Sequence, residues 1–132
     1  MSFEVTREML ERIARVAMGL RDCSHGHRPA VGEFFVRDDG IGGFGDCAVL
    51  VCHDEQFAFG NKSHKAACDL LMWCVRDRGW AVHDLWADTG EAACVVQSHG
   101  GRPRTPGYIC STLCEAIIRA ILAVCDQVEA LG

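Results

Sequence analysis

No long apolar run occurs in this sequence. Its 132 residues are 49% hydrophobic and 23% charged, an ordinary balance for a globular protein, but the longest apolar stretches are far shorter than the roughly 20 residues that a membrane-spanning helix needs. Residues 1–4 show neither the basic segment nor the apolar segment of a secretory signal. We therefore expect one soluble domain over residues 1–132, located in the cytoplasm and without a membrane partner.

An excess of basic charge is missing as well. The chain has 18 acidic residues against 13 Lys and Arg, a formal net charge of −5. Direct nucleic-acid binding rests on a basic surface that follows the phosphates, so we expect none here. Because the chain has no excess of basic residues, we interpret Trp73, Trp80 and Trp86 as core or rim aromatics and not as a base-stacking platform. The acidity suits a basic protein partner, or a partner whose nucleic-acid groove is basic.

Cysteine, by contrast, is abundant, with nine residues in the chain. The number is odd, the chain is long enough for a hydrophobic core, and most of these residues have apolar neighbours, as in the run from Ala48 to Cys52. A free cysteine behaves as a small buried hydrophobe. We therefore predict reduced core thiols and not a disulfide scaffold.

Apolar periodicity and cap residues predict an α+β fold in the order α-β-β-α-β-β-α. We expect one antiparallel sheet of about four strands with the helices packed on it. Thr6 is expected to cap the first helix, Phe57 and Phe59 to extend the second strand after a bulge, and Thr105 with Pro106 to start the last helix. The expected helices are 7–21, 64–78 and 107–130, and the expected strands are 33–36, 47–52, 80–86 and 91–98.

The second half of the chain carries short motifs that go together. A helix is followed by a Gly-Trp pair, then by two strands, a Thr-Pro pair and an Ile-Cys that leads into an alanine-containing helix. In this sequence the motifs are His64-Lys65-Ala66-Ala67-Cys68-Asp69, Arg78-Gly79-Trp80, Thr105-Pro106 and Ile109-Cys110-Ser111-Thr112-Leu113-Cys114-Glu115-Ala116-Ile117-Ile118-Arg119-Ala120.

On these motifs, residues 62–124 resemble the phage ABA-sandwich family. The resemblance implies that residues 62–131 form an ABA-sandwich-like half and that residues 1–60, with a helix and a hairpin, form a divergent N-terminal half. It also implies a phage or prophage origin. The family has no established catalytic residues, so the resemblance assigns none to this chain.

Three potential zinc ligands, Cys23, His25 and His27, lie within five residues. His25 and His27, followed by Asp38 after ten residues, also match the spacing of JAMM-type zinc isopeptidases, in which two histidines and an aspartate hold the metal. That motif carries a serine three residues before the aspartate, and Phe35 stands there in this chain. The alternative interpretation is a polar loop without metal.

The other motifs favour structure over chemistry. Gly40, Gly42 and Gly45 match G-x-G-x-x-G, but a strand and not a helix follows them, which predicts a hairpin turn with Phe44 as a contact residue. His53-x-Glu55 lacks the Pro-Cys-x-x-Cys partner motif of a zinc deaminase. Cys110 and Cys114, four residues apart, fit a core stripe on the last helix.

The leading hypothesis is a small non-enzymatic phage protein that binds a host protein or nucleoprotein complex and needs no cofactor. Its most specific version is an inhibitor of a bacterial defence complex, of the anti-CRISPR kind. The residues expected to contact the partner are Asp38, Asp39, Phe44, Asp54 and Glu55.

Two alternatives remain open. One is a zinc-dependent hydrolase or structural zinc module that uses Cys23, His25, His27 and Asp38. The other is a homodimer formed through the broad apolar stripe of the last helix.

Overall fold

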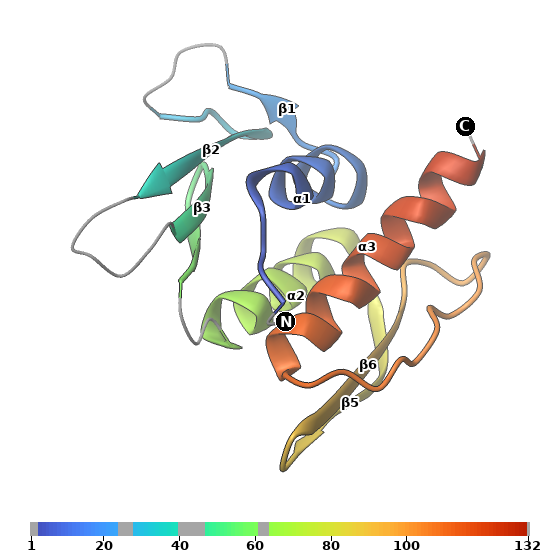
Figure 1. Cartoon of the computed structure of the whole chain (residues 1–132). Coiled ribbons are helices and arrows are strands. Elements are labelled where there is room, and N and C mark those ends of the chain that lie inside the picture. Colours follow the sequence, from blue (N-terminus) through green and yellow to red (C-terminus); the bar gives the residue numbers. More distant parts are fainter. Residues whose placement is uncertain (1–2, 24–27, 40–46, 61–63, 132) are drawn as a thin grey trace.

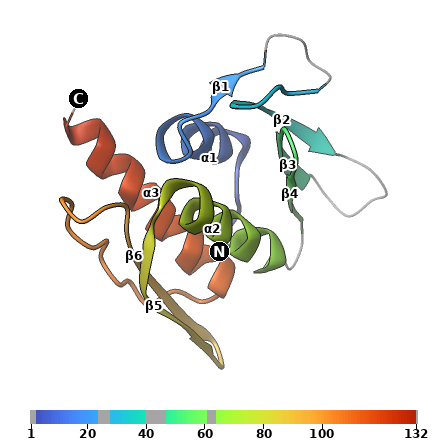
Figure 2. The same cartoon turned by 180° about the vertical axis from the view of Figure 1, so that it is seen from behind.

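The computed structural model describes residues 3–23, 28–39, 47–60 and 64–131. The predicted α+β class is confirmed, but the strands are divided between two sheets, one with the order β1-β2-β3-β4 and one formed by β5 and β6. The helices lie between the two sheets (Figures 1 and 2). The prediction of a single antiparallel sheet is therefore wrong, and β1 runs parallel to β2.

The first helix is shorter than predicted. The Oγ1 atom of Thr6 accepts a hydrogen bond of 3.2 Å from the Met9 amide and caps α1 (Arg7–Arg12), as expected. The helix continues as the π-helix η1 (Ile13–Ala17) and ends there, not at residue 21. Gly19 then takes a φ of +70°, a left-handed conformation that glycine adopts readily. The following residues form β1 (Arg21–Asp22), whose backbone bonds to the loop before β2.

The N-terminal sheet contains the predicted hairpin. Strand β2 (Glu33–Asp39) pairs antiparallel with β3 (Cys47–Cys52), and β3 pairs with β4 (Gln56–Phe59). Phe57 and Phe59 belong to this separate strand and do not extend β3, because the Cys52 amide donates to the Glu55 carbonyl and closes a tight turn between β3 and β4. The glycine-rich segment 40–45 lies outside the described residues.

Helix α2 (His64–Arg78) has the predicted bounds, and Gly79 follows it with a φ of +71°. The chain then forms the hairpin of β5 (Ala81–Asp88) and β6 (Glu91–Gln97). Gly90 closes this hairpin with a φ of +75°. Helix α3 packs on β6, so the hairpin is attached to the rest of the molecule mainly through its second strand.

The last helix, α3 (Leu113–Leu131), starts six residues later than predicted. Thr105 does not cap it. Its amide donates to the Val96 carbonyl, and its Oγ1 atom accepts from the Val96 amide at 3.0 Å. Cys110 forms a backbone bridge with Ala92, so the segment 105–110 lies along the second edge of β6. Thr112 caps α3 instead, by accepting from the Glu115 amide at 3.1 Å.

This arrangement predicts a specific cost for losing the Thr105 hydroxyl. The residue is 3% exposed, so Thr105→Val leaves the Val96 amide buried without an acceptor. We expect the free energy of unfolding to fall by about 1–3 kcal/mol. Thr105→Ser keeps the hydroxyl and serves as the control in the same denaturant titration. Equal losses in the two variants would contradict the hydrogen-bond account.

The apolar stripe of α3 is a core face. It packs against β6, α2 and η1, and its residues are covered within the chain itself, so the homodimer hypothesis cannot use them as an interface. The residues at 0–1% exposure are Ile117, Ile118, Ile121, Val124 and Cys125.

Seven thiols of the described residues are free, as predicted, namely those of Cys23, Cys52, Cys68, Cys74, Cys94, Cys110 and Cys125. Most of the cysteines with a described side chain are buried, and these are Cys52, Cys74, Cys94, Cys110, Cys114 and Cys125. Among the described helices, none has both the length and the apolar composition needed to cross a membrane.

Candidate functional site

The turn between β3 and β4 separates two surface hollows. Cys52, His53, Asp54 and Glu55 line both of them. The larger hollow, of about 550 Å³, extends over β2 and β3, and the smaller, of about 180 Å³, lies between the turn and α2. This turn carries two of the acidic residues that the sequence predicts as partner contacts.

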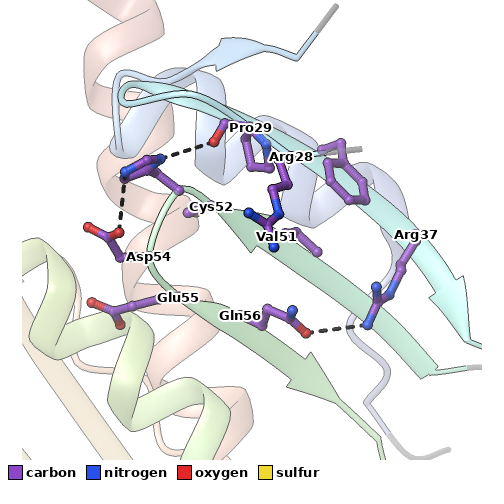
Figure 3. A pocket seen from close by; sticks show the side chains of 10 residues that line it. Arg28, Pro29, Arg37, Val51, Cys52, Asp54, Glu55 and Gln56 are labelled. Carbon is purple, nitrogen blue, oxygen red and sulfur yellow. Dashed lines mark hydrogen bonds and ion pairs between the residues drawn. The ribbon is translucent and has the colours of Figure 1, made fainter. Parts of the chain in front are cut away.

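Hydrogen bonds hold the turn on both sides. The His53 ring places Nδ1 3.2 Å from the Pro29 carbonyl and Nε2 3.3 Å from the Asp54 carboxylate (Figure 3). Glu55 forms an ion pair of 2.5 Å with Arg76 of α2, which engages its carboxylate within the fold. The Asp54 side chain, at 84% exposure, therefore offers the more accessible negative charge of the two.

Two cationic side chains also line the larger hollow. Arg28 lies near Val51 of β3, next to Pro29, and Arg37 lies on the far side, near Gln56 (Figure 3). Arg37 donates to the Gln56 side chain at 3.3 Å. Cys52 is the thiol of this lining, and burial raises its pKa to about 12, so it stays protonated near neutral pH. A protonated thiol is a poor nucleophile, and both ring nitrogens of His53 already face acceptors. The described lining therefore does not pair a nucleophile with a base.

The remaining predicted contact residues are not gathered at this turn. Asp38 lies toward the far end of the β2–β3 hairpin, where it forms an ion pair of 3.4 Å with Arg7. Asp39 pairs with Cys47 in the backbone register, and its side chain is outside the description. Phe44 lies outside the described residues. The structure thus brings Asp54 and Glu55 together and keeps Asp38 apart from them.

The predicted zinc ligands are only partly described. The Cys23 amide donates to the Phe34 carbonyl, and Asp38 follows four residues later on the extended strand, roughly 13 Å away at the usual rise. One ion therefore cannot be held by both Cys23 and Asp38. His25 and His27 lie outside the described residues. Within the described part of the chain, no group of three His, Cys, Asp or Glu residues could hold a metal. The zinc hypothesis stays a prediction.

A second surface was missed by sequence reasoning. No residue of β5 is buried, and Val82 and Leu85 are 39% and 43% exposed. Three carboxylates of the hairpin form no ion pair with another described residue, namely those of Asp84, Asp88 and Glu91. In the sequence, the available signal is the adjacent pair His83-Asp84 in the middle of the strand, because a strand with one covered face does not place polar residues side by side.

Comparison of the chain with protein-family models, with curated proteins and with solved structures found no match. The resemblance to the phage ABA-sandwich family stays a prediction on the quoted motifs.

Proposed function

We propose that this chain is a non-enzymatic protein that acts by binding another protein, and that the β5–β6 hairpin is its binding surface. The observation that carries the proposal is that no residue of β5 is buried and that all but Trp86 are exposed. A long, uncovered edge strand with exposed apolar side chains is an aggregation hazard that proteins usually cover or shorten. A partner that covers β5 would remove this hazard and bury Val82 and Leu85.

Charge supports a basic partner. The net charge is −5, and the hairpin contributes the carboxylates of Asp84, Asp88 and Glu91. A negative surface increases the rate of encounter with a positive one. An inhibitor of a bacterial defence complex, encoded by a phage, is the narrower form of this proposal, because such a complex contains the basic surfaces that bind nucleic acid. Small size and acidity support that narrower form.

The test is a quantitative capture experiment with matched surface variants. The tagged chain is incubated with bacterial lysate at about 0.3 M salt, where exposed charges alone are largely screened, and bound proteins are measured by mass spectrometry. Leu85→Ser changes the hairpin, and Leu131→Ser is the control, because Leu131 is 72% exposed at the far end of α3.

We expect the same stoichiometric partner with the wild type and with Leu131→Ser, and at least about tenfold less of it with Leu85→Ser, a loss of roughly 1.4 kcal/mol in binding. Equal capture by all three proteins would show that the hairpin is not the surface. A lysate that yields no stoichiometric partner for the wild type would count against the proposal as a whole.

A further inference from the structure

Backbone hydrogen bonds of β6 determine which groups of β5 face outward. The amide and the carbonyl of Ala92 both bond to Cys110, at 2.8 Å each. The amide and the carbonyl of Val96 both bond to Thr105. These groups therefore point away from β5. Since backbone direction alternates along a strand, Cys94 between them also points its amide and carbonyl away from β5.

The register transfers this direction to β5. Ala87, Leu85 and Val82 lie opposite Ala92, Cys94 and Val96. In an antiparallel pair, two opposite residues either bond to each other through both backbone groups or both point away. Val82, Leu85 and Ala87 thus direct their amides and carbonyls to the outer edge of β5. No other strand of the described chain pairs with that edge.

The two faces of the hairpin differ in chemistry. Cys94 and Ala92 are part of the core, so Leu85 and Ala87 opposite them share the face that is turned toward α3. Asp84 and Trp86 lie opposite Val95 and Ala93 on the other face, and Asp88 continues the same row at the tip. A strand added to β5 would meet aliphatic groups on one face, and carboxylates around an indole ring on the other.

We propose that β5 accepts an extended segment of the partner protein as an additional antiparallel strand, and that this segment alternates Lys or Arg with aliphatic residues. The inference rests on the proposed function and names the class of partner. The amides and carbonyls of Leu85 and Ala87 supply the backbone bonds. Cationic side chains opposite the row that contains Asp84 and Asp88 gain cross-strand charge pairing, and one over Trp86 gains a cation–π contact. Addition of a strand to a free edge is a common mode of peptide recognition.

A second copy of this chain fits the edge less well. If two copies pair their β5 strands antiparallel and both Leu85 and Ala87 form backbone bonds, Leu85 of one copy lies opposite Ala87 of the other. The same register places Asp84 opposite Asp88 twice, and like charges directly opposite each other destabilise a strand pair. A basic segment turns these two repulsions into attractions.

Synthetic peptides test the inference while the protein stays unchanged. The probe is a peptide of about ten residues that alternates lysine and valine, long enough to span a strand. In an antiparallel addition its valines lie opposite Leu85 and Ala87, so the valine amides face β5 and the lysine amides face solvent. N-methylation of the valines therefore removes the bonding edge, and N-methylation of the lysines removes only the solvent edge. A peptide with glutamate in place of lysine controls for charge.

Binding is measured by calorimetry at about 0.05 M and 0.3 M salt. We expect the lysine–valine peptide and its lysine-methylated form to bind, and the valine-methylated and glutamate peptides to bind at least about tenfold more weakly. Asp84→Asn with Asp88→Asn should weaken binding of the lysine–valine peptide several-fold, whereas Glu8→Gln on α1, an exposed acid outside the hairpin, should not.

Three outcomes would overturn the inference. They are equal effects of the two methylation patterns, equal binding of the lysine and glutamate peptides, and no binding of any peptide at about 1 mM. If Leu85→Ser abolishes partner capture while one of these outcomes is found, the partner binds the hairpin in another way, and only the inference fails. If Leu85→Ser leaves capture unchanged, the proposed function itself fails.

Discussion

Raising the pH above 9 is expected to destabilise the folded state of this protein. Burial raises the pKa of four thiols from the ordinary value of 9.0 to about 12. The unfolded chain therefore loses these protons from pH 9 upward, while the folded chain keeps them until about pH 12. Because the folded state binds more protons in this interval, its stability falls as the pH rises. The thiols are those of Cys52, Cys74, Cys94 and Cys125.

The expected effect is large relative to the stability of a small domain. At pH 10 each thiol costs about 1.4 kcal/mol, so four of them cost roughly 6 kcal/mol. A domain of this size has a total stability of about 5–15 kcal/mol. Below pH 8 the contribution vanishes, because both states are then protonated. Urea titrations from pH 8 to pH 10.5 measure the slope directly.

A single substitution isolates the thiol contribution. Cys94→Ala removes one of these four titrating groups. The fall in unfolding free energy per pH unit should become smaller by at most about a quarter, because burial also raises the pKa of Cys68 and Cys110, although the variant starts from a lower stability. Leu131→Ser, at an exposed position, should leave the pH dependence of the unfolding free energy unchanged. A stability that stays constant to pH 10.5 would show that these thiols do not stay protonated in the folded state.

Local signals explain which parts of the fold could be predicted. Helix α2 has the predicted bounds because the signals that set them are local, namely the apolar spacing of residues 64–78 and the glycine that follows at residue 79. Thr105 and Pro106 carry an equally strong local signal for a helix start, and there the prediction is wrong. The backbone of Thr105 bonds to Val96 of β6 instead. No feature within the segment 105–112 reveals that one edge of β6 is open to accept it.

The availability of the candidate contact residues also could not be predicted from local sequence signals. Asp54 and Glu55 are adjacent in the sequence and look equivalent, but Glu55 is engaged by Arg76, which lies 21 residues away. Whether an acidic residue is available to a partner thus depends on contacts that the local pattern does not contain. The β5 surface escaped prediction for a related reason. Apolar residues predict a strand, but whether its faces are covered depends on where α3 packs, and α3 packs on β6.

Ile121→Ala is expected to lower the free energy of unfolding by about 2–5 kcal/mol. Ile121 is fully buried at the contact of α3 with the rest of the core, so the truncation loses apolar contacts and leaves a cavity. The neighbouring residue Leu122 is only partly buried, and Leu122→Ala should cost about half as much or less. Urea titration of the two variants beside the wild type gives the comparison.

The same pair of variants tests in solution the assignment of the α3 stripe to the core. If the stripe packs within one chain, the loss at Ile121 is independent of protein concentration, because folding then involves no association. If the stripe joined two copies, the unfolding midpoint would rise with concentration, and Ile121→Ala would act mainly by weakening the dimer. The complete burial of Ile121 within a single chain predicts the first result. Of the α3 stripe and β5, only β5 would then offer apolar side chains to another protein.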